Sequence, residues 1–270
     1  MAPKVTIVVP VYNGEQFLPA CIESICAQTW TDFECVMVND GSSDGSGAIC
    51  DEVSRRDSRF RVIHQENGGL SRARNAGMRV SRGEYYLFLD ADDTIHPRLL
   101  ELALKEQAAH PQSLITWKFT HDLSEWNSTC FPSDPSVQIY GRWDLLRFFA
   151  DRVLFNSANN KLYPRELIEK HALWFDPAAG SVEDYVFFTA FWKVFLRISP
   201  TPISAKSNCP SIFTTRTMPA ASPTPPAPPT LVIFPATATS SWSFTPRQER
   251  FSVPLNNIPR RTFFLSPTPR

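Results

Sequence analysis

Short apolar runs alternate with segments of helical periodicity through the first third of the chain. The apolar runs have the length and β-branched content of strands, and they lie at residues 5–11, 33–38, 60–63 and 85–89. Between them, apolar residues recur at helical spacing in residues 15–29, 46–56 and 71–80. Because strands that alternate with helices favour a mainly parallel sheet covered by helices, we predict an α/β fold with a single sheet of this kind.

Polar side chains follow three of the predicted strands at the point where each strand ends. In sheets of this type, ligands bind at the carboxyl ends of the strands, so these side chains are expected to surround one crevice. Taken singly, Asp40-Gly41 and Asp44-Gly45 are also ordinary turn sequences, and Asp93 could cap a helix that begins near Pro97. The polar residues are Tyr12, Asn13 and Glu15 after the first strand, Asn39, Asp40, Ser42 and Asp44 after the second, and Asp90, Asp92 and Asp93 after the fourth.

The acids at residues 90–93 point to a cation. Three carboxylates in such a short segment repel one another unless a positive charge lies among them. A site of oxygen ligands alone favours Mg²⁺ or Mn²⁺, which complete their shells with water and substrate phosphates. No glycine-rich phosphate loop follows the first strand. We therefore expect a phosphate to be gripped through the metal.

Charge and hydropathy exclude several classes of function. Lys and Arg total 27 against 27 for Asp and Glu, without a basic block, so nucleic-acid binding is not expected. The longest apolar runs fall far short of the roughly 20 residues that a membrane span needs. The N-terminus reads directly into a strand, so we expect no signal peptide. We expect a cytoplasmic protein with reduced cysteines, and peripheral contact with the inner face of the membrane is left open.

Six separated stretches resemble the family 2 glycosyltransferases of the GT-A fold, in particular the enzymes that assemble polysaccharides. The resemblance covers about residues 3–197 and implies a fold of the nucleotide-diphospho-sugar transferase type, with a donor half at 1–97 and an acceptor half at 98–197. The matching stretches are Ile7-Val-Val-Pro-Val-Tyr-Asn13, Val38-Asn-Asp-Gly-Ser-Ser-Asp-Gly-Ser46, Asn67-Gly-Gly-Leu-Ser-Arg-Ala-Arg-Asn-Ala-Gly77, Leu87-Phe-Leu-Asp-Ala-Asp-Asp93, Asn160-Lys-Leu-Tyr163 and Val182-Glu-Asp-Tyr-Val-Phe187.

The resemblance implies a role for several residues of the donor half. Asp40 should contact the uracil or ribose of a nucleotide-sugar donor, with Tyr12 and Glu15 lining the same pocket. Arg72 lies where the family's loop closes over the donor, and its charge suits a phosphate or a sugar hydroxyl. For Arg74, solvation on the exposed face of a helix is an equally good interpretation.

The resemblance also implies roles for three acids. Asp92 would bind the metal that bridges the diphosphate, while Asp90 would face the ribose. Family 2 enzymes invert the anomeric centre, which requires one general base to deprotonate the acceptor hydroxyl. Asp184 matches that base, although an acid there also suits the first turn of a helix.

These assignments predict an inverting glycosyltransferase that moves a sugar from a nucleotide diphosphate, by expectation UDP, to a saccharide or lipid-linked acceptor. A sugar nucleotidyltransferase could share the fold, but it would need a glycine-rich loop with Arg and Lys in place of residues 12–15. The non-enzymatic alternative is a truncated protein that binds a nucleotide sugar and transfers little or nothing. That alternative rests on the C-terminal tail of the chain, residues 198–270.

Composition changes abruptly near Arg197. All 10 glycines lie at or before Gly180, whereas 15 of the 24 prolines lie at or after Pro200. Proline lacks the amide donor and fixes φ, so we expect residues 198–270 to form a Pro-, Ser- and Thr-rich tail that is poorly structured and lacks a stable core. This tail is either a genuine linker or interaction tail, or the product of a shifted reading frame.

We predict that this tail is a reading-frame product. The family continues after this point with a Pro-Leu-Tyr-x-Tyr segment and acidic residues, where this chain has residues 209–222. Codons permitted by those residues can spell such a segment in a shifted frame. Resequencing the gene tests this prediction, and an intact frame whose shifted reading spells no such segment would contradict it.

Overall fold

The computed structural model describes residues 2–120, 137–139, 157–198, 206–207, 210–214 and 231–235. These residues include positions 2–97 of the predicted donor half and the segment that carries Asp184. The predicted acceptor half is described only in part, and residues 121–136 and 140–156 lie outside the described residues.

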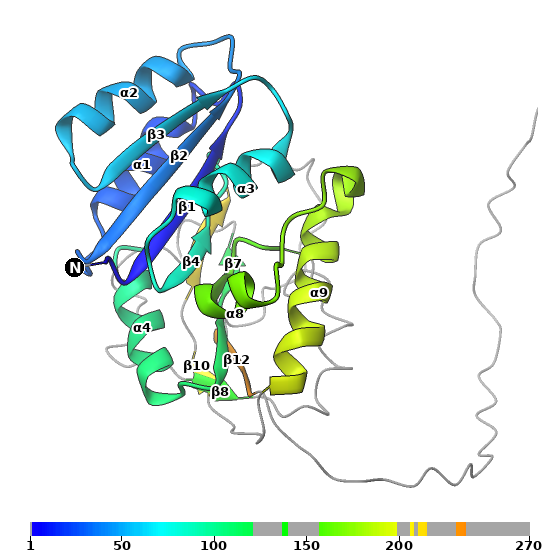
Figure 1. Ribbon diagram of the computed structural model, residues 1–270. Helices are drawn as coiled ribbons and strands as arrows, with labels where there is room; N and C mark the ends of the chain where they lie inside the picture. Colours follow the sequence, from blue (N-terminus) through cyan, green and yellow to red (C-terminus); the bar gives the residue numbers. More distant parts are fainter. Residues whose placement is uncertain are drawn as a thin grey trace, which may run out of the picture. The chain divides into compact units, whose positions relative to one another are not determined.

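Four neighbouring parallel strands form one side of the main sheet, and their carboxyl ends meet at one edge (Figure 1). All seven residues of β1 are buried, as expected for a strand covered on both faces. The sheet then continues beyond β4 with antiparallel partners, first β9 and then β6. The strand order is β10 (Lys206–Ser207), β8 (Val137–Ile139), β12 (Leu231–Pro235), β6 (Ser113–Thr116), β9 (Lys161–Pro164), β4 (Tyr85–Phe88), β1 (Val5–Val11), β2 (Phe33–Asp40) and β3 (Phe60–Gln65).

Alternation along each strand divides the core into two layers. Ile7, Val9 and Val11 belong to the cluster that includes the buried faces of α1, α2 and α4. Val8, between them, belongs to the opposite cluster with residues of α8 and α9. This is the period-2 arrangement that a sheet covered on both faces requires. The helices are α1 (Leu18–Cys26), α2 (Ser46–Arg56), α3 (Leu70–Val80), α4 (Leu99–Ala109), α8 (Arg165–Lys170) and α9 (Glu183–Ile198), with a 3₁₀ segment η3 at Pro177–Val182.

Helix α3 lies close against the sheet because Gly77 faces β1. A Cβ at Gly77 would approach Val8 Cγ1 to 2.5 Å, well inside van der Waals contact. The glycine therefore sets how near α3 can come to the strands whose ends form the crevice.

The predicted α/β architecture is confirmed, with two differences. Asp93 does not cap a helix, because it begins the short strand β5 (Asp93–Ile95), and α4 begins six residues later at Leu99. A second, three-stranded sheet is also present among the described residues, whereas one sheet was predicted. It joins β5 with β11 (Pro210–Thr214) and β7 (Lys118–Thr120).

Three short strands of the tail lie within the described residues. They are β10 (Lys206–Ser207), β11 and β12 (Leu231–Pro235), and β12 pairs antiparallel with β6. Two of them, β11 and β12, coincide with stretches between the prolines, Ser211-Ile-Phe213 and Leu231-Val-Ile-Phe234. The β-branched and aromatic residues of these stretches are good strand formers. The remainder of the tail lies outside the described residues, so the prediction for it stays a prediction.

Not one of the helices among the described residues combines the length and the apolar character that a membrane span requires.

The buried carboxylate of Glu34 links β2 to the segment that follows α3. Glu34 Oε1 accepts hydrogen bonds from Thr6 Oγ1 at 2.7 Å and from the Arg82 backbone N–H at 2.5 Å. Burial by itself would raise the pKa of Glu34. The hydrogen bonds from Arg82 and Thr6 outweigh burial and lower this pKa below its usual value of 4.5.

We predict that Glu34→Gln lowers the free energy of unfolding by about 1–3 kcal/mol near neutral pH, the scale of hydrogen bonds to a charged group. Because the folded-state pKa is depressed, this stabilisation is present above the unfolded-state pKa and is lost as the pH falls through the folded-state value. Urea unfolding of both proteins from neutral to acid pH measures the difference. Glu23→Gln on the exposed surface of α1 is the control. A difference between wild type and Glu34→Gln that stays constant down to acid pH would contradict the assignment.

Candidate functional site

The loops after β1 and β2 interlock through side-chain hydrogen bonds. Glu15 Oε2 accepts from the Gly45 N–H at 2.8 Å, and the Glu15 N–H donates to Asp44 Oδ2 at 3.1 Å. Asn13 has a positive φ of 48°, and its Oδ1 accepts from the Ser43 N–H at 2.8 Å. The two loops therefore form one connected wall of the crevice. Glu15 is part of that wall through its carboxylate, and Tyr12 is exposed beside it with 56% of its surface accessible.

Asp40 anchors the loop between β3 and α3. Its side chain is buried at the end of β2, where Oδ1 accepts from Gln65 Nε2 at 2.6 Å and from the Gly68 N–H at 2.9 Å. The Gly69 N–H donates to Oδ2 at 2.8 Å, and Gly69 has a φ of 84° that favours glycine. Asp40 thus uses three acceptor sites within the protein, which leaves little capacity for a ligand. Its predicted contact with a nucleotide stays a prediction.

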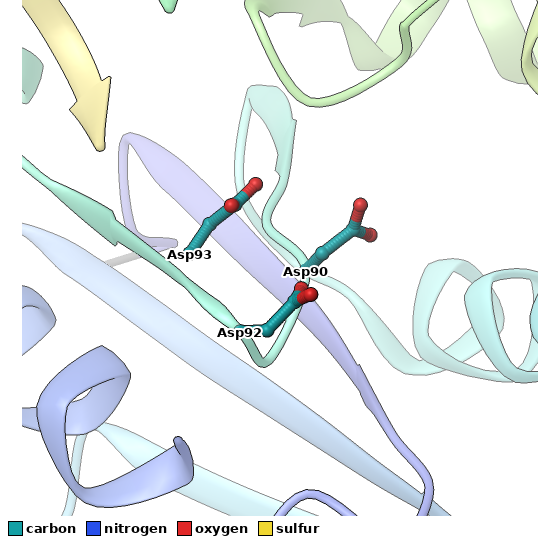
Figure 2. A group of neighbouring side chains, drawn as sticks. All are labelled: Asp90, Asp92 and Asp93. Atoms are coloured by element: carbon teal, nitrogen blue, oxygen red, sulfur yellow. The ribbon is translucent and has the colours of Figure 1, made fainter. Parts of the chain in front are cut away.

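Three carboxylates converge at the turn that joins β4 to β5. Asp90, Asp92 and Asp93 each place a carboxylate oxygen within 4.8 Å of the others. Figure 2 shows the three side chains gathered around this turn. The turn is closed by a hydrogen bond from the Asp93 N–H to the Asp90 carbonyl at 3.0 Å. The predicted grouping of these acids is therefore present.

A short turn before β9 reaches across to these acids. Asn159 Nδ2 donates to Asp93 Oδ2 at 2.8 Å and approaches Asp90 Oδ2 at 3.3 Å. The preceding residue, Ala158, donates its backbone N–H to Asp184 Oδ2 at 2.9 Å. Adjacent residues of one turn thus contact both the acid cluster and the predicted base.

Arg74 joins the predicted base to the acid cluster. Its Nη2 donates to Asp90 Oδ1 at 2.8 Å, and its Nη1 donates to Asp184 Oδ1. The side chain of Arg74 is only 1% exposed. Burial by itself would lower the pKa of Arg74, but Asp90 and Asp184 together raise it above its usual value, so the guanidinium stays charged.

Arg72 and Arg74 of α3 occupy opposite environments. Arg74 is buried, so the interpretation that it is solvated on an exposed helix face is wrong. Arg72 is the exposed one of the pair. It lines a cavity of about 480 Å³ together with Gln65, Glu66, Asn67, Gly68, Asn75, Arg79 and Pro177. This cavity lies beside the loop that Asp40 anchors, and the predicted role of Arg72 in donor binding stays a prediction.

Asp184 lies in the first turn of α9, as the helix-terminus interpretation expects. Its carboxylate nevertheless turns toward the crevice, because both oxygens are held by Arg74 and Ala158. Position at a helix end and membership of the site are therefore compatible.

The acid cluster suits a hard divalent cation in ligand type and spacing. All three groups are carboxylates, and their oxygen atoms are close enough to share one ion. The sequence argument that these acids need a positive charge is met in part by Arg74. Arg74 pairs with Asp90 and Asp184, and a cation held by the three clustered acids would reduce the repulsion among them.

Sequence reasoning missed three contributors. The environment of Arg74 was left open. Ala158 and Asn159 come just before the matching stretch Asn160-Lys-Leu-Tyr163 and show no periodicity of their own. Lys161 is buried beside them, and its Nζ donates to the Ser157 carbonyl and to Asn160 Oδ1, each at 2.6 Å. Burial lowers the pKa of Lys161 to about 7, and Asp184 opposes this shift.

Comparison with known proteins places the chain in a family. The model of the family described as "Glycosyl transferase family 2" matches residues 6–172, which is more than half of the chain. The uncharacterised glycosyltransferase EpsJ of Bacillus subtilis is 35% identical over 190 residues, covering 69% of this chain and 55% of EpsJ. Chondroitin synthase of Pasteurella multocida is 36% identical over 104 residues, covering 38% of this chain and 11% of that enzyme.

Solved structures show the same fold. TarS of S. aureus in complex with UDP-GlcNAc has a TM-score of 0.61 and 24% identity, covering 80% of this chain and 60% of the TarS chain. The chain spans about half the length of the relatives EpsJ and EpsH, at 55% and 52%. With the family model matching from β1 through α8 and the acid cluster at the edge of its sheet, the chain belongs to glycosyl transferase family 2.

Proposed function

We propose that the protein is an inverting glycosyltransferase that moves a sugar from a nucleotide-diphosphate donor, taken to be a UDP-sugar, to a saccharide or lipid-linked acceptor. Asp184 is the general base and Asp92 the metal ligand in this proposal. The observation that carries it is the link through Arg74 between Asp184 and the acid cluster. A base and a cluster suited to a diphosphate-bound cation then lie on opposite sides of one guanidinium.

The reaction follows from these positions. Asp184 accepts the proton of the acceptor hydroxyl while that oxygen forms a bond to the anomeric carbon. The bond from this carbon to the diphosphate breaks at the same time, so the nucleoside diphosphate leaves with the electron pair and the configuration inverts. When bound at Asp92, Mn²⁺ or Mg²⁺ supplies charge neutralisation for the leaving diphosphate.

The donor pocket is proposed to lie over the loops that follow β1, β2 and β4. Tyr12 offers an exposed ring, and Asp90, which the Arg74 guanidinium holds, faces the ribose in this arrangement. Glu15 and Asp40 support the walls through bonds to Gly45 and Gly68. Arg72 would close over the donor from α3.

Polysaccharide or glycan assembly is the setting that the comparisons favour. A stretch of this chain resembles a chondroitin synthase, an enzyme whose name denotes a polysaccharide product. TarS, which shares the fold, was solved with UDP-GlcNAc, and this guides the choice of the first donor to test. A protein that binds a nucleotide sugar without transferring it is the competing outcome. Calorimetric titration with UDP and Mn²⁺, followed by a UDP-sugar hydrolysis assay, separates the two.

The first site prediction concerns the cation. Asp92→Asn should abolish Mn²⁺-dependent binding of UDP, because the amide removes the negative charge that the ion needs. Isothermal titration with UDP and Mn²⁺ measures the effect, and circular dichroism checks the fold. Asp32→Asn, an exposed position at the opposite end of β2, is the matched control. An unchanged Mn²⁺-dependent affinity in Asp92→Asn would rule out this assignment.

The second site prediction concerns the base. Asp184→Asn should leave the affinity for UDP nearly intact and reduce turnover by roughly two to four orders of magnitude, the usual contribution of general-base catalysis. Initial rates of transfer or hydrolysis of UDP-GlcNAc and UDP-glucose measure it. Glu183→Gln changes the neighbouring acid and should keep most of the activity. If Asp184→Asn is active and Glu183→Gln is not, the base is Glu183.

A further inference from the structure

One face of α3 is polar, and it points inward. Ser71, Arg74 and Asn75 are buried and lie at i, i+3 and i+4, so they share that face. Ser71 Oγ donates to the Asp176 carbonyl at 3.2 Å, and Asn75 Nδ2 donates to the Phe175 carbonyl at 2.8 Å. All three residues therefore contact the segment that leads into α9.

Phe175 connects this face to α9. Asn75 Oδ1 accepts from the Phe175 N–H at 3.0 Å, so one amide side chain holds both backbone groups of Phe175. The Phe175 ring lies 5.0 Å from the Arg74 guanidinium carbon, and it stacks on Phe187 with centroids 4.0 Å apart and planes 10° apart. Phe187 is three residues after Asp184 on the same helix. The guanidinium thus rests on a ring that is itself fixed to the helix carrying the base.

The planar fork of Arg74 fits two carboxylates from separate elements. Asp90 comes from the end of β4, on the proposed donor side, and Asp184 comes from α9. Each carboxylate takes a different terminal nitrogen of one rigid group. A lysine carries the same charge as a single flexible ammonium group, so it cannot reproduce this paired geometry.

We propose that Arg74 is a positioning residue that holds the general base, Asp184, in a fixed position relative to the donor-site acid, Asp90. This inference rests on the proposed function of Asp184 as the base. Arg74 fixes Asp184 Oδ1 while the Ala158 N–H fixes Oδ2, and the loss of Arg74 leaves the carboxylate with one anchor and freedom to rotate. Displacement of a catalytic group by about 1 Å can cost on the order of 100-fold in rate.

The kinetic test is a double-mutant cycle with Arg74→Lys and Asp184→Asn. Arg74→Lys should lower kcat for UDP-sugar hydrolysis by about 10- to 100-fold, while the affinity for UDP, measured by titration, changes by less than about threefold. In the Asp184→Asn background, Arg74→Lys should lower kcat no further, because the base that it positions is already gone. Arg56→Lys, at an exposed position of α2, should keep the wild-type rate.

Three kinetic results separate failure of the inference from failure of the proposed function. Normal turnover in Asp184→Asn removes the base and with it the proposed function. A low rate in Asp184→Asn with a normal rate in Arg74→Lys overturns only the positioning role. Full additivity of the two substitutions, or a loss of UDP affinity as large as the loss of kcat, would show that Arg74 acts on the donor and not on the base.

A second cycle does not depend on activity. Melting temperatures of wild type, the two single variants and the double variant report the coupling between Arg74 and Asp184 in the folded protein. The double variant should lose less than the sum of the single losses, because each substitution breaks the same pair. Additive losses would overturn the inference even if no UDP-sugar is turned over. Both cycles use Arg74→Lys because this substitution keeps the buried positive charge between Asp90 and Asp184.

Discussion

A single buried guanidinium organises the crevice of this protein. Arg74 is enclosed between β4 and α9, and it carries a positive charge into a region with four carboxylates. Removing one partner of such a buried pair is costly, because the remaining charge is left without compensation. The positions of Asp90 and Asp184 are therefore set together. The structure couples the acid at the end of a strand to the acid at the start of a helix more than 90 residues later in the sequence.

The rest of the crevice is built by backbone hydrogen bonds to acidic side chains. Asp40 holds the loop before α3, and Glu15 and Asp44 join the two loops at the ends of β1 and β2. These carboxylates accept from N–H groups that turns leave without partners, which is how a crevice made of loops keeps its shape. Acids thus serve as scaffolding in the outer loops, and at Asp90, Asp92 and Asp93 they form a cluster with oxygen atoms within 4.8 Å of one another.

The sequence predicted the parallel strands and their helices well because hydrophobic periodicity is a local signal. The predicted helix at 46–56 coincides with α2, and the first strand coincides with β1. Arg74 could not be placed in the same way, since the buried face of α3 carries Ser71, Arg74 and Asn75 where a buried face normally carries apolar residues. Periodicity therefore does not distinguish this buried face of α3 from a face that is exposed to solvent. Asn159 and Ala158 act only through contacts with residues far away in sequence, which no local pattern records. The second sheet was missed for a related reason, because β5, β7 and β11 are short strands that pair with partners far away in the sequence.

The most direct test of this account is a crystal structure of the Arg74→Lys variant compared with that of the wild type. The account predicts that α9 and the sheet keep their places while the Asp184 carboxylate swings away from Asp90 and keeps only its bond to the Ala158 N–H. An Asp184 carboxylate that stays where the wild type holds it, with the lysine in place, would contradict the claim that the fork of Arg74 sets the position of the base.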